Sequence, residues 1–167
     1  MSPVNSPRPS NRAIVSLGSN VEPRAEYLKR ALDALSSLPD TRFVKASSVR
    51  ETDPVDVPEE FAALKFLNQV AIFSTGLNPF DFSSRMHEIE DDLGRVRTVR
   101  NGPRTIDIDL IDFGGQVINT PELTLPHPRA HLRDFVLRPL AELDALAATQ
   151  IFEDRGVSVQ YAPDFML

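Results

Sequence analysis

Apolar and polar positions along the chain follow strand and helix periodicities in turn. Residues 12–17 form a short apolar run that ends in a Gly-Ser-Asn cluster, which predicts a strand and then a turn that a phosphate can approach. A helix is expected after Pro23, because five apolar residues recur there at the spacing of one buried helix face. They are Leu28, Ala31, Leu32, Leu35 and Leu38.

Two more strands are expected in the first half of the chain. Residues 41–51 predict one strand, although Lys45, Ser47 and Ser48 do not favour it. Residues 52–58 form a loop that two prolines stiffen. Residues 66–74 contain a continuous apolar stretch, which is typical of a central strand and not of an exposed edge.

The second helix has the clearest local signals. Asn78 suits the N-cap, Pro79 suits the first helical position, and Gly94 is expected at the C-cap. His87 and Glu90 lie three residues apart on a flanking face, which permits a polar site at the edge of the sheet or an ordinary surface. The predicted core stripe consists of Phe82, Met86, Ile89 and Leu93.

A last strand and a hairpin complete the pattern. Residues 105–113 predict a strand, Gly114-Gly115 a tight hairpin turn, and residues 116–119 a returning strand. The order β-α-β-β-α-β predicts an α+β fold with a ferredoxin-like core, in which two helices pack on one face of an antiparallel sheet. The opposite face would then be open to build the active site.

Composition limits the class of protein. The 167 residues are 41% hydrophobic and 25% charged, as expected of one domain, and we expect a disordered arm at residues 1–11 and a single domain at residues 12–167. The sequence has no cysteine and no apolar run of about 18 residues, so we expect a cytoplasmic protein without disulfides or membrane spans. The net charge of −6 argues against nucleic-acid binding and requires any anion site to be built locally.

Residues 94–110 are the most informative segment for chemistry. Four arginines occur there without an intervening acid, at Arg95, Arg97, Arg100 and Arg104. Guanidinium groups keep their positive charge at all physiological pH values and suit phosphate oxygens. The segment therefore predicts a place for a polyphosphate.

An Asp-x-Asp strand follows the arginines directly. Residues two apart in a strand point to the same face, so Asp107 and Asp109 should share one side with Ile111, opposite Ile106 and Ile108. Two adjacent carboxylates resist desolvation unless a base or a divalent cation joins them, and magnesium suits such a pair. The alternative is a half-exposed strand whose polar side carries two acids.

His127 stands between Pro126 and Pro128, which restrict its backbone strongly. A histidine fixed in this way can donate a hydrogen bond to a phosphate oxygen, or it can merely cap a turn. The local sequence does not separate these two interpretations.

Six segments occur in a specific order. They are SLGSN at residues 16–20, TDPV at 52–55, FLNQV at 66–70, IEDDLGRVR at 89–97, GPRTIDIDL at 102–110 and LPHPRAHLRDFVLRPLAEL at 125–143. Together they resemble the 6-hydroxymethyl-7,8-dihydropterin pyrophosphokinase family. The resemblance implies an enzyme of folate biosynthesis that transfers the β,γ-pyrophosphoryl group of ATP to the pterin hydroxymethyl oxygen and releases AMP.

The same resemblance implies roles for individual residues. Asp107 and Asp109 match positions that hold two Mg²⁺ ions, and Arg95 and Arg104 match catalytic positions on the polyphosphate. The matched ATP-binding positions are Glu90, Arg97, His127 and Arg133. The matched pterin-binding positions are Thr52, Val55, Phe66, Asn68 and Phe135.

Some positions leave alternatives or depart from the family pattern. Core packing is the alternative for Phe66 and Phe135, whereas the Asn68 amide in an apolar strand needs a partner. Asn101 stands where many members carry an aromatic residue. Residues 150–167 match no part of the family. The alternation of Val157, Val159 and Tyr161 permits an added edge strand there.

The expected ligands are ATP as co-substrate, the dihydropterin and magnesium, with no nucleic acid and no membrane, and the expected state is a monomer. Two other functions stay open. One is an ATP-binding module whose altered loop has lost the transfer reaction. The other is a unit of a fused folate enzyme or of a complex, for which the Ser/Pro-rich N-terminal arm gives weak support.

Overall fold

The computed structural model describes residues 10–54, 57–95 and 103–153. The predicted N-terminal arm up to residue 9 lies outside these ranges, as does the alternation of Val157, Val159 and Tyr161. The strands are β1 (Asn11–Ser19), β2 (Thr41–Ala46), β3 (Arg50–Thr52), β4 (Phe66–Thr75), β5 (Asp107–Phe113), β6 (Ile118–Asn119) and β7 (Thr124–Leu125). The helices are α1 (Arg24–Ser36), α2 (Pro79–Asp92), α3 (Asp134–Leu143) and α4 (Ala145–Glu153), with short 3-10 turns at η1 (Glu59–Phe61) and η2 (Ala130–Leu132).

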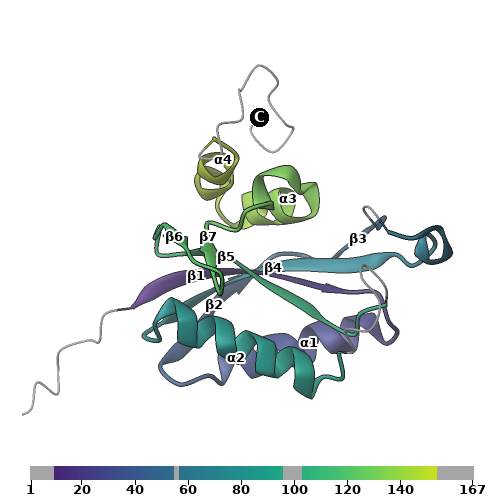
Figure 1. Cartoon of the computed structure of the whole chain (residues 1–167), viewed down its shortest axis with the longest axis horizontal. Coiled ribbons are helices and arrows are strands. Elements are labelled where there is room, and N and C mark those ends of the chain that lie inside the picture. Colours follow the sequence, from purple (N-terminus) through teal and green to yellow (C-terminus); the bar gives the residue numbers. More distant parts are fainter. Residues whose placement is uncertain (1–9, 55–56, 96–102, 154–167) are drawn as a thin grey trace, which may run out of the picture.

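The main sheet is antiparallel and has the predicted ferredoxin-like topology. Its strand order is β2-β4-β1-β5, and β3 also pairs with β4. Helices α1 and α2 lie side by side on one face of the sheet (Figure 1). Their apolar stripes meet the sheet in one core, in which Leu28, Leu35, Phe73, Phe82 and Met86 are buried. Burial of these side chains is the main favourable term that holds the two layers together.

Helix α2 begins and ends close to where its sequence signals predict. The Asn78 side chain accepts a hydrogen bond from the Asp81 N–H at 2.9 Å, and Pro79 is the first helical residue. The helix ends at Asp92, and Gly94 follows the cap with a φ of 87°, a conformation that glycine adopts without strain.

The prediction of one strand over residues 41–51 is wrong, because the chain bulges at Ser47. Ala46 pairs with Ala71, and Arg50 pairs with Asn68. The segment therefore advances by four residues where β4 advances by three, which leaves one extra residue in a bulge. The Ser47 side chain fills the gap, because its Oγ accepts the Val70 N–H at 3.0 Å. The bulge divides the segment into β2 and β3.

The end of β1 also differs from the prediction. Gly18 and Ser19 were expected in a turn, but both still pair with β4, opposite Asn68 and Leu67. The strand therefore extends two residues further than the apolar pattern indicates, which brings Gly18 into the sheet.

The predicted returning strand does not join the main sheet. Gly114 and Gly115 do form the turn, with φ values of 59° and 72°, but β6 pairs with β7 in a separate two-stranded sheet. The outer edge of β5 is already bonded elsewhere. The Ile108 N–H donates to the Glu90 carboxylate at 2.9 Å, and the Ile111 carbonyl accepts the His127 N–H at 2.8 Å.

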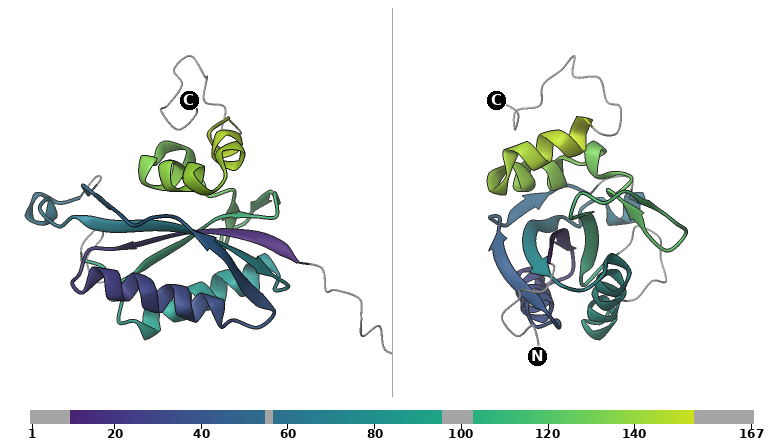
Figure 2. Two further views of the ribbon diagram at one scale, coloured as in Figure 1. Left: turned by 180° about the vertical axis from the view of Figure 1, so that it is seen from behind. Right: turned by 90° about the vertical axis from the view of Figure 1, so that its left-hand side faces the viewer.

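Helices α3 and α4 cover part of the face that was expected to be open. They lie across the sheet from α1 and α2, which gives three layers (Figures 1 and 2). Their buried residues meet Ile14, Val70, Ile72 and Ile111 in a second core. The part of this face beside the start of α3 stays uncovered. In the described part of the chain, no helix is long and apolar enough to cross a membrane.

Candidate active site

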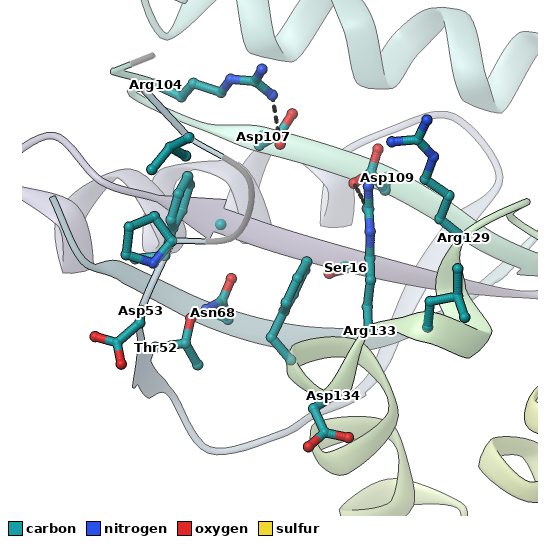
Figure 3. A pocket seen from close by; sticks show the side chains of 16 residues that line it. Ser16, Thr52, Asp53, Asn68, Arg104, Asp107, Asp109, Arg129, Arg133 and Asp134 are labelled. Atoms are coloured by element: carbon teal, nitrogen blue, oxygen red, sulfur yellow. Dashed lines mark hydrogen bonds and ion pairs between the residues drawn. The ribbon is translucent and has the colours of Figure 1, made fainter. Parts of the chain in front are cut away.

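A cavity of about 850 Å³ opens on the uncovered part of the sheet, beside the start of α3. Its floor is formed by the central strands β4 and β1 and the edge strand β5. One wall is formed by η2 and α3 (Figure 3). The opposite wall comes from the loop that follows Thr52. Segments that are far apart in the sequence therefore meet at one opening.

Strand register places the polar side chains of the floor in two rows. Gly18 pairs with both Asn68 and Asp107, and Ser16 pairs with Asp109. Directly paired residues of antiparallel strands project to the same face. Both carboxylates consequently face the cavity with Asn68, while Ile108 is buried in the core beneath α1 and α2. The prediction that Asp107 and Asp109 share one face is confirmed.

Gly18 keeps the centre of the floor open. A Cβ atom at this position would lie 3.1 Å from Asn68 Oδ1 and 3.4 Å from Phe66 Cδ1. The first distance is tighter than an ordinary van der Waals contact, so any larger residue would push the amide or the ring out of place. The absence of a side chain here is part of the shape of the site.

Three arginines contact the two carboxylates. Arg104 Nη1 donates to Asp107 Oδ2 at 3.0 Å, and Arg95 Nη1 lies 3.1 Å from Asp107 Oδ1. Arg133 Nη1 lies 3.5 Å from Asp109 Oδ2. Figure 3 shows Arg104 and Arg133 approaching the acids from different sides. The site thus has the local positive charge that a protein of net charge −6 needs in order to bind an anion.

Arg129 is a further arginine on the cavity wall, and the sequence analysis missed it. Among the described residues, its guanidinium makes no ion pair, unlike those of Arg95, Arg104 and Arg133. Its position within the Leu-Pro-His-Pro-Arg segment was visible in the sequence. What the sequence did not show is that η2 turns this residue toward the same opening as Asp109 (Figure 3).

The backbone of Arg104 is held by Asn20. The Arg104 N–H donates to Asn20 Oδ1 at 2.6 Å, and the Asn20 N–H donates to the Arg104 carbonyl at 3.1 Å. These two bonds join the loop before β5 to the end of β1. Asn20 was expected in a turn that approaches phosphate, and the structure instead gives it a role in fixing an arginine.

His127 has a fixed orientation, as its two flanking prolines predicted. Its Nδ1 accepts the Arg129 N–H at 3.1 Å, so the neutral ring carries its proton on Nε2. That Nε2 lies 3.8 Å from Asp109 Oδ1. The imidazole therefore presents a donor at the rim of the acidic pair.

The nearby arginines do not fully offset the cost of a negative charge on Asp109. Burial and the neighbouring charge of Asp107 raise the pKa of Asp109 to about 7, although Arg133 and Arg95 act in the opposite direction. Hard carboxylate oxygens with such a pKa suit a divalent cation, which would remove both the repulsion and the desolvation cost. The two residues that could hold magnesium are thus Asp107 and Asp109.

The donor set for a metal is small. Within the described ranges, no group of three or more His, Cys, Asp or Glu side chains is arranged to hold a metal ion. Magnesium is usually bound by one or two carboxylates together with substrate phosphates and water, so the pair alone fits its chemistry.

The other end of the cavity is more apolar. Phe66 and Phe135 line it from β4 and α3, and Asn68, which is almost fully buried, lies on the floor. The Asn68 Nδ2 donates to Thr52 Oγ1, so the amide has the partner that its buried position requires. Both phenylalanine rings face the cavity, and therefore core packing alone does not account for them.

Not every residue of the predicted site can be placed at the cavity. Val55 and Arg97 lie outside the described residues, as does Asn101. Glu90 is fully buried and accepts a hydrogen bond from Arg95. Its position therefore does not support the predicted direct contact with ATP. The cavity also includes Ser16 and Asp53, which the sequence analysis did not assign to the site.

The comparisons with known proteins identify the family. The family model described as 7,8-dihydro-6-hydroxymethylpterin-pyrophosphokinase (HPPK) matches residues 14–145. A 2-amino-4-hydroxy-6-hydroxymethyldihydropteridine pyrophosphokinase of Bacillus subtilis is 42% identical over 134 residues, which are 80% of this chain and 78% of that protein. The protein of the same name from Pseudomonas aeruginosa is 42% identical over 132 residues, 79% of this chain and 80% of that protein.

Solved structures support the fold. The HPPK-DHPS of Plasmodium falciparum, wild type with pteroate, superposes with a TM-score of 0.62 at 15% identity. The match covers 80% of this chain and 39% of that one, so this chain spans well under half the length of that protein. The chain belongs to the 7,8-dihydro-6-hydroxymethylpterin-pyrophosphokinase family.

Proposed function

We propose that this protein transfers the pyrophosphoryl group of ATP to the hydroxymethyl oxygen of 6-hydroxymethyl-7,8-dihydropterin and releases AMP, a step of folate biosynthesis. The observation that carries the proposal is the pairing of Asp107 and Asp109 on one cavity face, next to guanidinium groups and to the apolar pocket around Asn68. The test is incubation of the purified protein with MgATP and the dihydropterin. AMP formation supports the proposal. ATP binding without AMP formation supports the alternative of an inactive binding module.

The arginine side of the cavity is proposed to bind the polyphosphate. Transfer of a phosphoryl group depends mainly on alignment of the reacting oxygens and on neutralisation of charge on the phosphates. Arg95, Arg104 and Arg133 surround the acidic pair, and Arg129 adds a guanidinium without an ion pair among the described residues. The His127 Nε2–H would donate to a phosphate oxygen from the same side.

Asp107 and Asp109 are proposed to hold two Mg²⁺ ions together with the phosphates of ATP. Bound there, magnesium would neutralise phosphate oxygens and orient them. The undercompensated Asp109 carboxylate supports this assignment. Asp107 would exchange its contacts with Arg95 and Arg104 for a metal, which frees both guanidinium groups for the phosphates.

The apolar end of the cavity is proposed to bind the pterin. Phe66 and Phe135 would pack against the two faces of the flat ring system, and the Asn68 amide would bond to its polar edge. Thr52 orients that amide through its hydroxyl group. The matched position of Val55 lies outside the described residues.

Asn68→Ala should weaken dihydropterin binding about 10- to 100-fold, because the edge of the ring loses its partner inside a desolvated pocket. The turnover number at saturating pterin should change much less, since the phosphates lie at the other end of the cavity. Titration of the pterin by fluorescence, together with steady-state kinetics, measures both quantities. Asn119→Ala, at an exposed position of β6, is the matched control. Equal pterin affinity in the wild type and Asn68→Ala would contradict the assignment.

The raised pKa of Asp109 gives a pH prediction. A carboxyl-carbon NMR titration, with Asp109→Asn to identify the signal, should show a midpoint near pH 7 in the free protein. Magnesium with a nonhydrolysable ATP analogue should lower this pKa by at least about 2 units, because the metal binds only the ionised form. A midpoint that magnesium and the analogue leave unchanged would show that Asp109 does not hold the ion.

The same shift has a defined effect on stability. The unfolded carboxyl group ionises near its ordinary pKa of 3.8, whereas the folded one keeps its proton up to about pH 7. As pH rises between these two values, the unfolded state loses its proton first and is favoured. The contribution of Asp109 to the free energy of unfolding therefore falls over this interval.

Residues 12–167 would form one domain, active as a monomer, and a cytoplasmic location would give access to ATP. Gel filtration tests the monomer. Because the HPPK region of the Plasmodium falciparum protein is part of a longer HPPK-DHPS chain, co-purification with other folate enzymes would favour the alternative of a complex.

A further inference from the structure

Glu90 has a fully buried carboxylate that the proposed function does not yet use. It lies on α2, on the far side of β5 from the cavity, and the residue is 0% exposed. Its carboxylate accepts hydrogen bonds from the Ile108 N–H at 2.9 Å and from Arg95 Nη1 at 2.5 Å, and the His87 Nδ1 lies 2.9 Å away. A buried carboxylate is costly unless it is paired in this way, so removal of one partner is strongly felt.

The bond to Ile108 lies at the outer edge of the sheet. Strand β5 is the last strand of the main sheet in the described part of the chain, and there no neighbouring strand accepts the outward N–H of Ile108. The Glu90 carboxylate accepts this N–H in place of a strand carbonyl. Because Ile108 lies between Asp107 and Asp109, the bond fixes the backbone from which both acids project.

The bond to Arg95 reaches around the same edge. One atom, Arg95 Nη1, lies 2.5 Å from Glu90 Oε2 and 3.1 Å from Asp107 Oδ1. The Arg95 N–H also donates to the Glu90 carbonyl at 3.1 Å, so both the backbone and the side chain of Arg95 are anchored to Glu90. The guanidinium is held between a carboxylate behind the strand and a carboxylate in the cavity.

We infer that Glu90 is a positioning residue for Arg95 in the proposed transfer reaction, on which this inference rests. If Asp107 held a metal ion, Arg95 would lose one of its two carboxylate partners. Its contact with Glu90 would remain, so the guanidinium would already be in position for the polyphosphate. A group held in advance in this way contributes to the rate and not to pterin binding.

Glu90→Gln is the informative substitution, because an amide oxygen can still accept the Ile108 N–H while the charge that holds Arg95 is lost. The turnover number should fall about 30-fold, and the dihydropterin dissociation constant should change by less than about twofold. Glu88→Gln, on the exposed side of the same helix, should behave as the wild type. Unchanged turnover in Glu90→Gln, or equal losses in turnover and pterin binding, would overturn the inference.

A double-mutant cycle separates positioning from a general loss of structure. If Glu90 acts through Arg95, then Glu90→Gln should lower turnover by no more than about twofold in an Arg95→Ala background. A further 30-fold loss there, of the size expected in the wild-type background, would overturn the inference.

An NMR measurement tests the same contact without any turnover. The Arg95 Nε–H signal, identified by its absence in Arg95→Ala, should be resolved in the wild type and averaged in Glu90→Gln. A resolved signal in both proteins would contradict the role of Glu90. An inactive wild type with the expected change in this signal would refute the proposed function and leave the positioning role standing.

Discussion

Replacing Asp109 by asparagine should lower the turnover number by at least about 10³-fold, because the variant removes one of the two carboxylates that β5 directs into the cavity as proposed metal ligands. The amide has nearly the same shape, so the cavity should keep its form. Asp107→Asn should have an effect of similar size, and it should also free Arg95 and Arg104 from their shared partner.

The stability of Asp109→Asn should be equal to or higher than that of the wild type above pH 7. Burial and Asp107 raise the pKa of Asp109, so its ionisation opposes folding, and the amide removes that cost. Thermal unfolding at pH 8 measures the stability, and single-turnover kinetics measure the chemistry. Asp92→Asn, at an exposed position near the end of α2, is the control. A folded Asp109→Asn protein with wild-type turnover would refute the metal assignment.

Replacing Arg104 by alanine should lower the turnover number about 100-fold and leave pterin affinity within about twofold, since its guanidinium lies beside Asp107, at the end of the cavity proposed to bind the phosphates. Truncation of this side chain should not move the loop. The backbone of Arg104 is held by Asn20 through two hydrogen bonds that the substitution leaves intact.

Arg104→Lys should recover only part of the loss, because an ammonium group supplies charge without the paired donors of a guanidinium. Quench-flow detection of AMP with saturating pterin is the direct assay, and Arg42→Ala, at an exposed position of β2, is the control. Loss of pterin affinity with unchanged turnover in Arg104→Ala would contradict the assignment of this arginine to the polyphosphate end of the cavity.

Local signals in the sequence were sufficient for much of the fold. The caps of α2 and the alternation of β5 follow from interactions within a few residues, so Asn78 and the face shared by Asp107 and Asp109 could be predicted. The division of residues 41–51 could not, because it depends on the bond between the Ser47 side chain and the backbone of β4. Such a contact has no local signature.

The site was predicted where one strand or one motif carries it, and missed where distant segments meet. Period-two geometry placed the acidic pair, whereas Arg129 reaches the cavity only because η2, which follows it, packs against α3 and α4. Glu90 illustrates the same limit. Helical spacing puts it on a flanking face, and only the position of β5 as an edge strand shows that the carboxylate is enclosed and bonded to Ile108.

The most direct test is a crystal structure with Mn²⁺ in place of magnesium, a nonhydrolysable ATP analogue and the dihydropterin, with the metal located by anomalous scattering. We expect metal peaks at about 2.0–2.2 Å from carboxylate oxygens of both Asp107 and Asp109, with the guanidinium groups turned to the phosphates. Metal bound only to the nucleotide, with Asp107 still paired to Arg95 and Arg104, would contradict the metal assignment.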